Sequence, residues 1–158
     1  MTWIKAFLFP QNTQERSYSL FILAMRILFG VLLMSHGIQK LNNYSALAGG
    51  AFPDPLGIGS EASVVLAIFG EVLCSAAFIA GFLYRLSMIP MIVTMIVAFF
   101  AVHSGDVSGG ELAFVYLLVF IIMYIAGPGR YSIDRIIAKR LYSKNNTSKY
   151  NTTTWRRN

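Results

Sequence analysis

Four long apolar segments constrain the fold of this chain more than any other feature of its sequence. Leu, Ile, Val, Phe, Met and Ala occupy all sides of each segment, without the polar stripe of a soluble amphipathic helix. About 20 residues at 1.5 Å each cross a hydrocarbon core of roughly 30 Å, and lipid forces the backbone to satisfy its own hydrogen bonds. We therefore predict an all-α integral membrane four-helix bundle, with helices at about 19–41, 61–84, 86–103 and 111–127.

The distribution of the apolar residues in four long segments excludes a soluble domain, and the composition agrees. Charged residues make up 13% of the chain, against about 25% in soluble domains. The first apolar segment is longer than the core of a signal peptide and no small-residue cleavage pattern follows it, so we expect it to stay in the protein. The single cysteine, Cys74, excludes a dithiol pair within the chain.

The basic residues lie on one side of the predicted bundle. Of thirteen Lys and Arg residues, all except Arg26 and Lys40 precede the first helix, lie between the second and third, or follow the fourth. The loops at 42–60 and 104–110 contain none. The positive-inside rule therefore places both the N and the C terminus in the cytoplasm.

The loop at 42–60 differs from an ordinary hydrophilic connection. It is long, and it contains apolar residues punctuated by Gly and Pro. Loops of this length are commonly lids, binding loops or disordered segments, and this one is too apolar for disorder in water. We expect it to fold back over the outer end of the bundle or into the membrane interface.

The chain after the fourth helix predicts a turn and a short interfacial helix. Gly127-Pro128-Gly129 ends a helix, and Ser132 is a suitable N-cap for a helix with Asp134 in its first turn. Apolar and basic residues then alternate at helical spacing, which predicts an amphipathic helix at about 132–143 on the anionic inner leaflet. We treat 1–143 as a single transmembrane domain and expect the polar tail at 144–158 to be disordered.

Ionisable side chains lie inside the predicted helices, where each costs roughly 2.5–3.5 kcal/mol to insert. At 1.5 Å per residue, Glu71, His36 and His103 fall about 20–27 Å from the cytoplasmic side and share one layer in the outer half. Arg26 lies lower, with a side chain long enough to reach up to Glu71 or down to headgroups. The candidates for a ligand or proton site are Glu71, His36, His103, Lys40, Arg26 and Glu111.

Two interpretations of this layer remain open at the level of sequence. Either the groups form a satisfied network that holds the helices together, or they build a ligand or proton site. Polar contacts between membrane helices contribute only about 0.6 kcal/mol each, which hardly offsets the insertion of five ionisable residues and favours a site. A metal site of His36, His103 and Glu71 has suitable ligand types without supporting spacing, so we predict none.

Short motifs follow one another along the helices. They are Arg26 with 36–41 (HGIQKL), 69–71 (FGE), Gly81 through Arg85, and 127–134 (GPGRYSID). In their order and spacing, from Leu23 to Ile136, they resemble the DoxX family of small bacterial four-helix membrane proteins. The resemblance implies a multi-pass protein of the bacterial inner (cytoplasmic) membrane. The motif residues to which it assigns a structural role are Gly127, Pro128, Gly129, Arg130 and Asp134.

The resemblance also carries a limited functional expectation. The family is named for a subunit of a quinone-linked oxidoreductase complex, so we expect a quinone-associated membrane subunit that acts with a soluble or membrane redox partner. Glu71, His36 and His103 would supply the hydrogen bonds and proton exchange that a quinone needs. Whether the chain is itself an enzyme stays open.

Two other functions fit the same sequence. One is a non-catalytic scaffold that recruits partners through the basic tail and the outer loop. The other is transport of a small solute or proton, for which four helices enclose little volume unless the protein forms a homo-oligomer. Beyond quinone and the lipid bilayer, we expect no haem, flavin or metal cofactor and no nucleic-acid partner.

Overall fold

The computed structural model describes residues 16–142, and this part of the chain contains four helices long and apolar enough to cross a membrane. They run over Arg16–Asn42, Ser60–Ala80, Tyr84–Val102 and Val107–Ala126. Turns and short helices join them, and residues 16–142 contain no strand. The prediction of an all-α membrane bundle is confirmed.

Two of the four spans contain a π-helical turn, one within the span and the other at its end. The first span is the continuous helix α2 (Arg16–Asn42), and the fourth is α7 (Val107–Ala126). The second consists of α4 (Ser60–Ile68), the π turn η2 (Phe69–Leu73) and α5 (Cys74–Ala80). The third consists of α6 (Tyr84–Ile96) and the π turn η3 (Val97–Val102).

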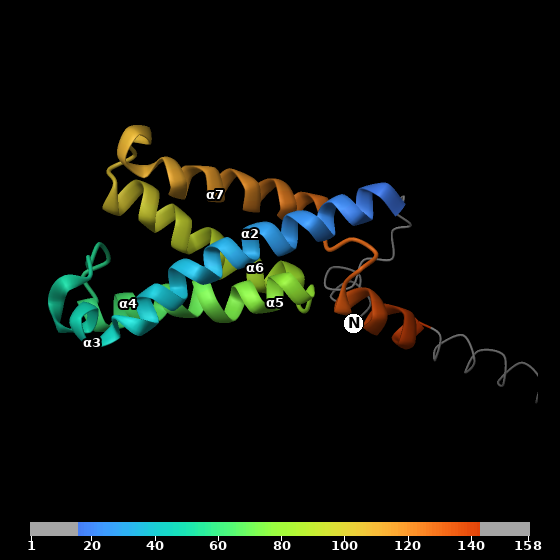
Figure 1. Cartoon of the computed structure of the whole chain (residues 1–158), viewed down its shortest axis with the longest axis horizontal. Helices are drawn as coiled ribbons and strands as arrows, with labels where there is room; N and C mark the ends of the chain where they lie inside the picture. The colour runs from blue at the N-terminus through green and yellow to red at the C-terminus, as the bar shows by residue number, and fades with distance from the viewer. Residues whose placement is uncertain (1–15, 143–158) are drawn as a thin grey trace, which may run out of the picture.

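The spans form two pairs that diverge along the bundle. Figure 1 shows α2 beside α4 and α5, and α6 beside α7, with the pairs farther apart at one end. That end carries α3 (Tyr44–Ala46), η1 (Leu47–Ala51) and the loop to α4, and we call it the loop end. At the opposite end, which we call the basic end, α2 begins and α7 ends.

Local capping explains where the helix ends differ from the prediction. The second span stops at Ala80 rather than at 84, because Gly81 adopts the left-handed region with φ 66°. The fourth begins at Val107 rather than at 111. There the Asp106 carboxylate accepts hydrogen bonds of 3.1 Å from the N–H groups of Ser108 and Gly109.

The predicted interfacial helix is present over 133–142. Ser132 caps it as expected, since its hydroxyl oxygen accepts a 3.2 Å hydrogen bond from the N–H of Arg135. Figure 1 places this helix beside the basic end of the bundle, past the end of α5. Residue 143 and the predicted disordered tail at 144–158 lie outside the described residues.

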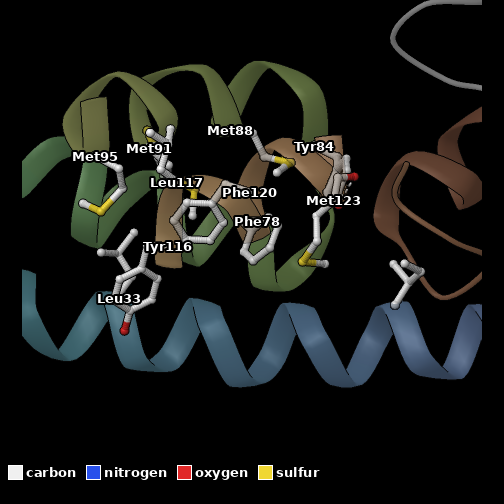
Figure 2. Packing of buried hydrophobic residues seen from close by; sticks show 12 residues of the cluster. Leu33, Phe78, Tyr84, Met88, Met91, Met95, Tyr116, Leu117, Phe120 and Met123 are labelled. Carbon is white, nitrogen blue, oxygen red and sulfur yellow. Dashed lines mark hydrogen bonds between the residues drawn. The ribbon is translucent and has the colours of Figure 1, made fainter. Parts of the chain in front are cut away.

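Aromatic and methionine side chains fill the centre of the bundle. Figure 2 shows methionines of α6 facing aromatic residues of α5 and α7 above α2. Phe78 stacks on Tyr84 with ring centroids 5.5 Å apart and meets Phe120 edge-on at 5.7 Å. Because methionine is flexible, it can fill the irregular gaps between these rings. This cluster joins all four spans and sets the spacing of the polar groups on either side of it.

Candidate functional site

An ion pair connects α2 to the π turn of the second span. Lys40 Nζ lies 2.5 Å from Glu71 Oε2, and the carboxylate side chain is 5% exposed while the lysine is 25% exposed. Gly37, one turn before Lys40, lets α2 pack closely against η2. A Cβ at Gly37 would lie 2.8 Å from Glu71 Cβ. The pairing of Lys40 with Glu71 explains how a carboxylate can remain at this depth.

The backbone around Glu71 is irregular on two neighbouring spans. Glu71 lies within η2, and η3 ends directly before His103. Gly70, also in η2, packs so closely on α6 that a Cβ would lie 2.6 Å from Thr94 Oγ1. Single π turns inside α-helices occur frequently at functional sites. Here η2 and η3 border the same space.

That space is a cavity of about 280 Å³ in the loop half of the bundle. Its polar lining comes from Lys40, Glu71, Thr94, His103 and Ser63. The remaining lining is apolar and comes from α4, α6, η3 and the loop at 42–60: Phe52, Pro53, Pro55, Leu56, Leu66, Ala67, Val93, Val97, Ala98 and Val102. A mostly apolar space with a few convergent polar groups is the usual character of a small-molecule site.

The cavity opens sideways, toward lipid. Leu66 of α4 and Val93 of α6 both line it, yet they are 54% and 51% exposed. Val93 lies at the middle of its span and Leu66 about two turns inside the start of its span, so this exposed surface is expected to face hydrocarbon. A molecule that enters between α4 and α6 therefore comes from the lipid phase.

The loop at 42–60 forms part of the cavity wall, which agrees with the first of its two predicted arrangements, in which it folds back over the end of the bundle. Asp54 holds its shape: the carboxylate accepts hydrogen bonds from the N–H of Gly59 at 2.7 Å, the N–H of Ile58 at 3.0 Å and the hydroxyl of Ser63 at 2.9 Å. The hydrogen bond from Gly59 is the main reason that the pKa of Asp54 is lowered. Asp54 thus fastens the loop to the start of α4.

The other predicted candidates near the loop end lie around this site rather than inside it. The ring of His36 packs edge-on against Tyr116, with centroids 6.2 Å apart, and does not line the cavity. Glu111 is exposed near the start of α7. Of the predicted layer of Glu71, His36 and His103, only Glu71 and His103 line the cavity, and Lys40 lines it with them.

Arg26 belongs to a separate network at the basic end. Of the two predicted directions, the side chain takes the one away from Glu71, toward the basic end, where its guanidinium is 1% exposed and bound by backbone carbonyls. Nε and Nη2 donate to the carbonyls of Phe78 (3.0 Å) and Ile79 (2.5 Å), near the end of α5. Nη1 donates to the carbonyls of Pro128 (2.9 Å) and Tyr131 (2.8 Å). Arg26 therefore caps α5 and fixes the turn after α7, which is a structural role.

Asp134 completes this network from the interfacial helix. Its carboxylate accepts 2.8 Å hydrogen bonds from the N–H groups of Leu83 and Tyr84, where α6 begins. Its own N–H donates to the carbonyl of Gly81 at 3.0 Å. Burial raises the pKa of Asp134, and the N–H groups of Tyr84 and Leu83 oppose that rise. The motif residues at the basic end thus tie the interfacial helix to the turn between α5 and α6.

Two polar lining residues of the cavity, and the aspartate that holds its loop wall, were not predicted from the sequence. Thr94 and Ser63 are ordinary in membrane helices, and no sequence signal marks them as lining residues. Asp54 stands between two prolines in a loop with several glycines, a pattern typical of an ordered turn. Among the described residues, His, Cys, Asp and Glu do not gather into a group of three that could hold a metal ion.

Comparisons with known proteins agree with the motifs. The family model DoxX matches residues 21–104. The inner membrane protein YqjF of Escherichia coli is 30% identical, over 75% of this chain and 93% of that protein. An uncharacterized membrane protein of Mycobacterium tuberculosis is 28% identical, over 75% of this chain and 82% of its own length. No solved structure matches the chain significantly. The chain belongs to the DoxX family.

Proposed function

We propose that the cavity beside the Lys40–Glu71 pair binds the ring of a quinone, and that the protein is a quinone-associated membrane subunit of an oxidoreductase complex. The observation that carries the proposal is an apolar cavity with an ion pair in its wall and an opening toward lipid. A quinone is lipid-soluble and needs an apolar slot with a few hydrogen-bond donors for its carbonyl oxygens. The name of the Escherichia coli relative supports location in the bacterial inner membrane.

The residues of the cavity fit such a ring. The Lys40 ammonium has three N–H donors, of which one is directed at Glu71, and its partial exposure leaves it accessible from the cavity. His103, also in the lining, offers a second hydrogen-bonding group. At about 280 Å³ the space lies at the lower end of the usual range for ligand pockets, which suits one ring with its tail left in lipid.

In this proposal the quinone carries out the redox chemistry, and the side chains of the protein bind it and hold protons. A bound quinone supplies two-electron redox chemistry coupled to two protons. Lys40 would hydrogen-bond to the ring and orient it, Glu71 holds the lysine in place, and the pair would supply protonatable groups at the cavity wall. With a single cysteine the chain has no dithiol couple of its own, so the electrons come from a partner subunit.

The test is mass spectrometry of the quinone that copurifies with the full chain in mild detergent. Lys40→Met removes a charged donor, so we expect at least about a tenfold loss of bound quinone. Glu71→Gln should also deplete it, because the lysine is then released. Glu111→Gln is the matched control, since that carboxylate is exposed and does not line the cavity.

A second pair of variants tests whether quinone occupies the cavity without changing any charge. Ala98 and Ala101 both lie in η3, but only Ala98 lines the cavity. Ala98→Phe should therefore fill the space and displace quinone, while Ala101→Phe should leave it bound. Equal quinone content in all variants, or none in the wild type, would contradict the proposal.

A further inference from the structure

A second hollow lies at the basic end, away from the quinone cavity. It is a groove of about 650 Å³ between the end of α5 and the start of the interfacial helix. Three exposed basic residues from separate parts of the chain line it: Arg16 at the start of α2, Arg130 in the turn after α7, and Lys139 in the interfacial helix. Tyr131, Ile133 and Ile136 supply its less polar surface.

The Arg26 network holds this groove in shape. Arg26 fixes the carbonyls of Pro128 and Tyr131 on either side of Arg130. Asp134 fixes the interfacial helix to the start of α6. Because Arg26 and Asp134 are each 1% exposed, their bonds do not compete with water. The basic side chains therefore project from a rigid frame, which reduces the entropy lost on binding.

We propose that this groove binds the phosphodiester headgroup of an anionic phospholipid. Three cationic side chains complement the phosphate, and arginine forms strong charge-assisted hydrogen bonds to such oxygens. The groove lies at the ends of the spans, at the depth of lipid headgroups. Ile133 and Ile136 are 40% and 53% exposed and offer apolar contact to the first part of an acyl chain.

A headgroup site in this groove differs from the general attraction of a basic surface to an anionic membrane. General attraction depends on the number of positive charges, so each exposed Lys or Arg near the surface contributes similarly. A built site depends on which charges line it. Arg140 gives the contrast, because it is exposed on the same helix as Lys139 and does not line the groove. The inference does not rest on quinone binding.

The experiment titrates the full chain, in a neutral detergent, with phosphatidylglycerol and follows one-to-one binding by native mass spectrometry. Phosphatidylcholine is the zwitterionic comparison, and inorganic phosphate is the competitor. We expect phosphatidylglycerol to bind about tenfold or more tightly than phosphatidylcholine, and the double variant Arg130→Gln/Lys139→Gln to remove that preference. Arg140→Gln should change the affinity by less than about twofold.

A variant that keeps every charge completes the test. Ala80 is exposed and lines the groove, so Ala80→Trp should block it without altering the net charge. Loss of phosphatidylglycerol binding in this variant supports a defined site. Equal weakening by Arg140→Gln and Lys139→Gln would overturn the proposal in favour of diffuse attraction. Displacement by inorganic phosphate at the concentration of the lipid would assign the site to a free anion instead.

Discussion

Arg26 and Glu71 both carry the free-energy cost of placing an ionisable side chain in a membrane span, and they are stabilised in different ways. Each places an ionisable group inside a span, at a penalty of roughly 2.5–3.5 kcal/mol. Arg26 offsets it with four hydrogen bonds to backbone carbonyls, whereas Glu71 has Lys40 and a cavity beside it. Depth along a helix is readable from sequence, but the direction of a side chain around the helix is not. The sequence therefore grouped two residues that the structure separates.

Because the guanidinium of Arg26 is planar and binds several carbonyls at once, we predict that lysine cannot replace it. Lysine keeps the charge but lacks the rigid fork that reaches the carbonyls of Phe78 and Pro128 together. We expect Arg26→Lys to lower the free energy of unfolding by about 3 kcal/mol, because two or more charge-assisted hydrogen bonds are lost. Thermal unfolding in detergent measures the effect, with exposed Arg16→Lys as the control. An unchanged midpoint would show that the carbonyl network does not stabilise the bundle.

At the scale of elements, the spans were predictable and their irregularities were not. Apolar length alone located all four, since lipid permits no other structure for such segments. The residues of η2 and η3 do not differ in type from those of the α-helices around them, because a π turn shifts the backbone without requiring a particular residue. The two turns could therefore not be predicted from the sequence. Gly109 and Gly110 are poor helix formers, so the sequence predicts a loop there, whereas the Asp106 cap starts α7 at Val107.

The contact of α2 with η2 depends on the absence of a side chain at Gly37. An added Cβ would lie 2.6 Å from Val72 Cγ2 and 2.8 Å from Glu71 Cβ, so Gly37→Ala must push α2 away. We expect a loss of about 1–3 kcal/mol in unfolding free energy and weaker quinone retention. Gly49→Ala is the matched control, because nothing lies within 4 Å of its added Cβ. Equal behaviour of the two variants would contradict this account of the helix contact.

The loop held by Asp54 should respond to acid. Its folded pKa lies below the ordinary value of about 3.9, so its stabilising effect is complete above that pH and is lost as the pH falls through the lowered pKa. Hydrogen exchange at the amides of Ile58 and Gly59 should accelerate in that acidic range, relative to the intrinsic rate. Asp54→Asn should show the faster exchange already at pH 6. Protection that is independent of pH in the wild type would exclude this role for the carboxylate.

At the scale of the whole molecule, the two ends of the bundle are built differently. The basic end is closed by buried hydrogen bonds of Arg26 and Asp134, which the motifs marked as important without showing why. The loop end diverges around a cavity, which arises from spans that meet only in the folded molecule. For that reason the sequence predicted the layer of polar groups but not the space beside them. We propose that the closed end positions the protein in the membrane and the open end takes the ligand.

Photolabelling with an azido-substituted quinone, followed by peptide mapping, tests the central claim most directly. A quinone bound in this cavity should give adducts on both sides of the lateral opening, around Leu66 in α4 and Val93 in α6, and an excess of unlabelled quinone should abolish them. The lipid-facing residues Ile122 and Ile125 of α7 are more exposed and lie outside the cavity, so they should stay unlabelled. Labelling that simply follows lipid exposure, strongest on α7 and insensitive to competitor, would contradict a quinone site between α4 and α6.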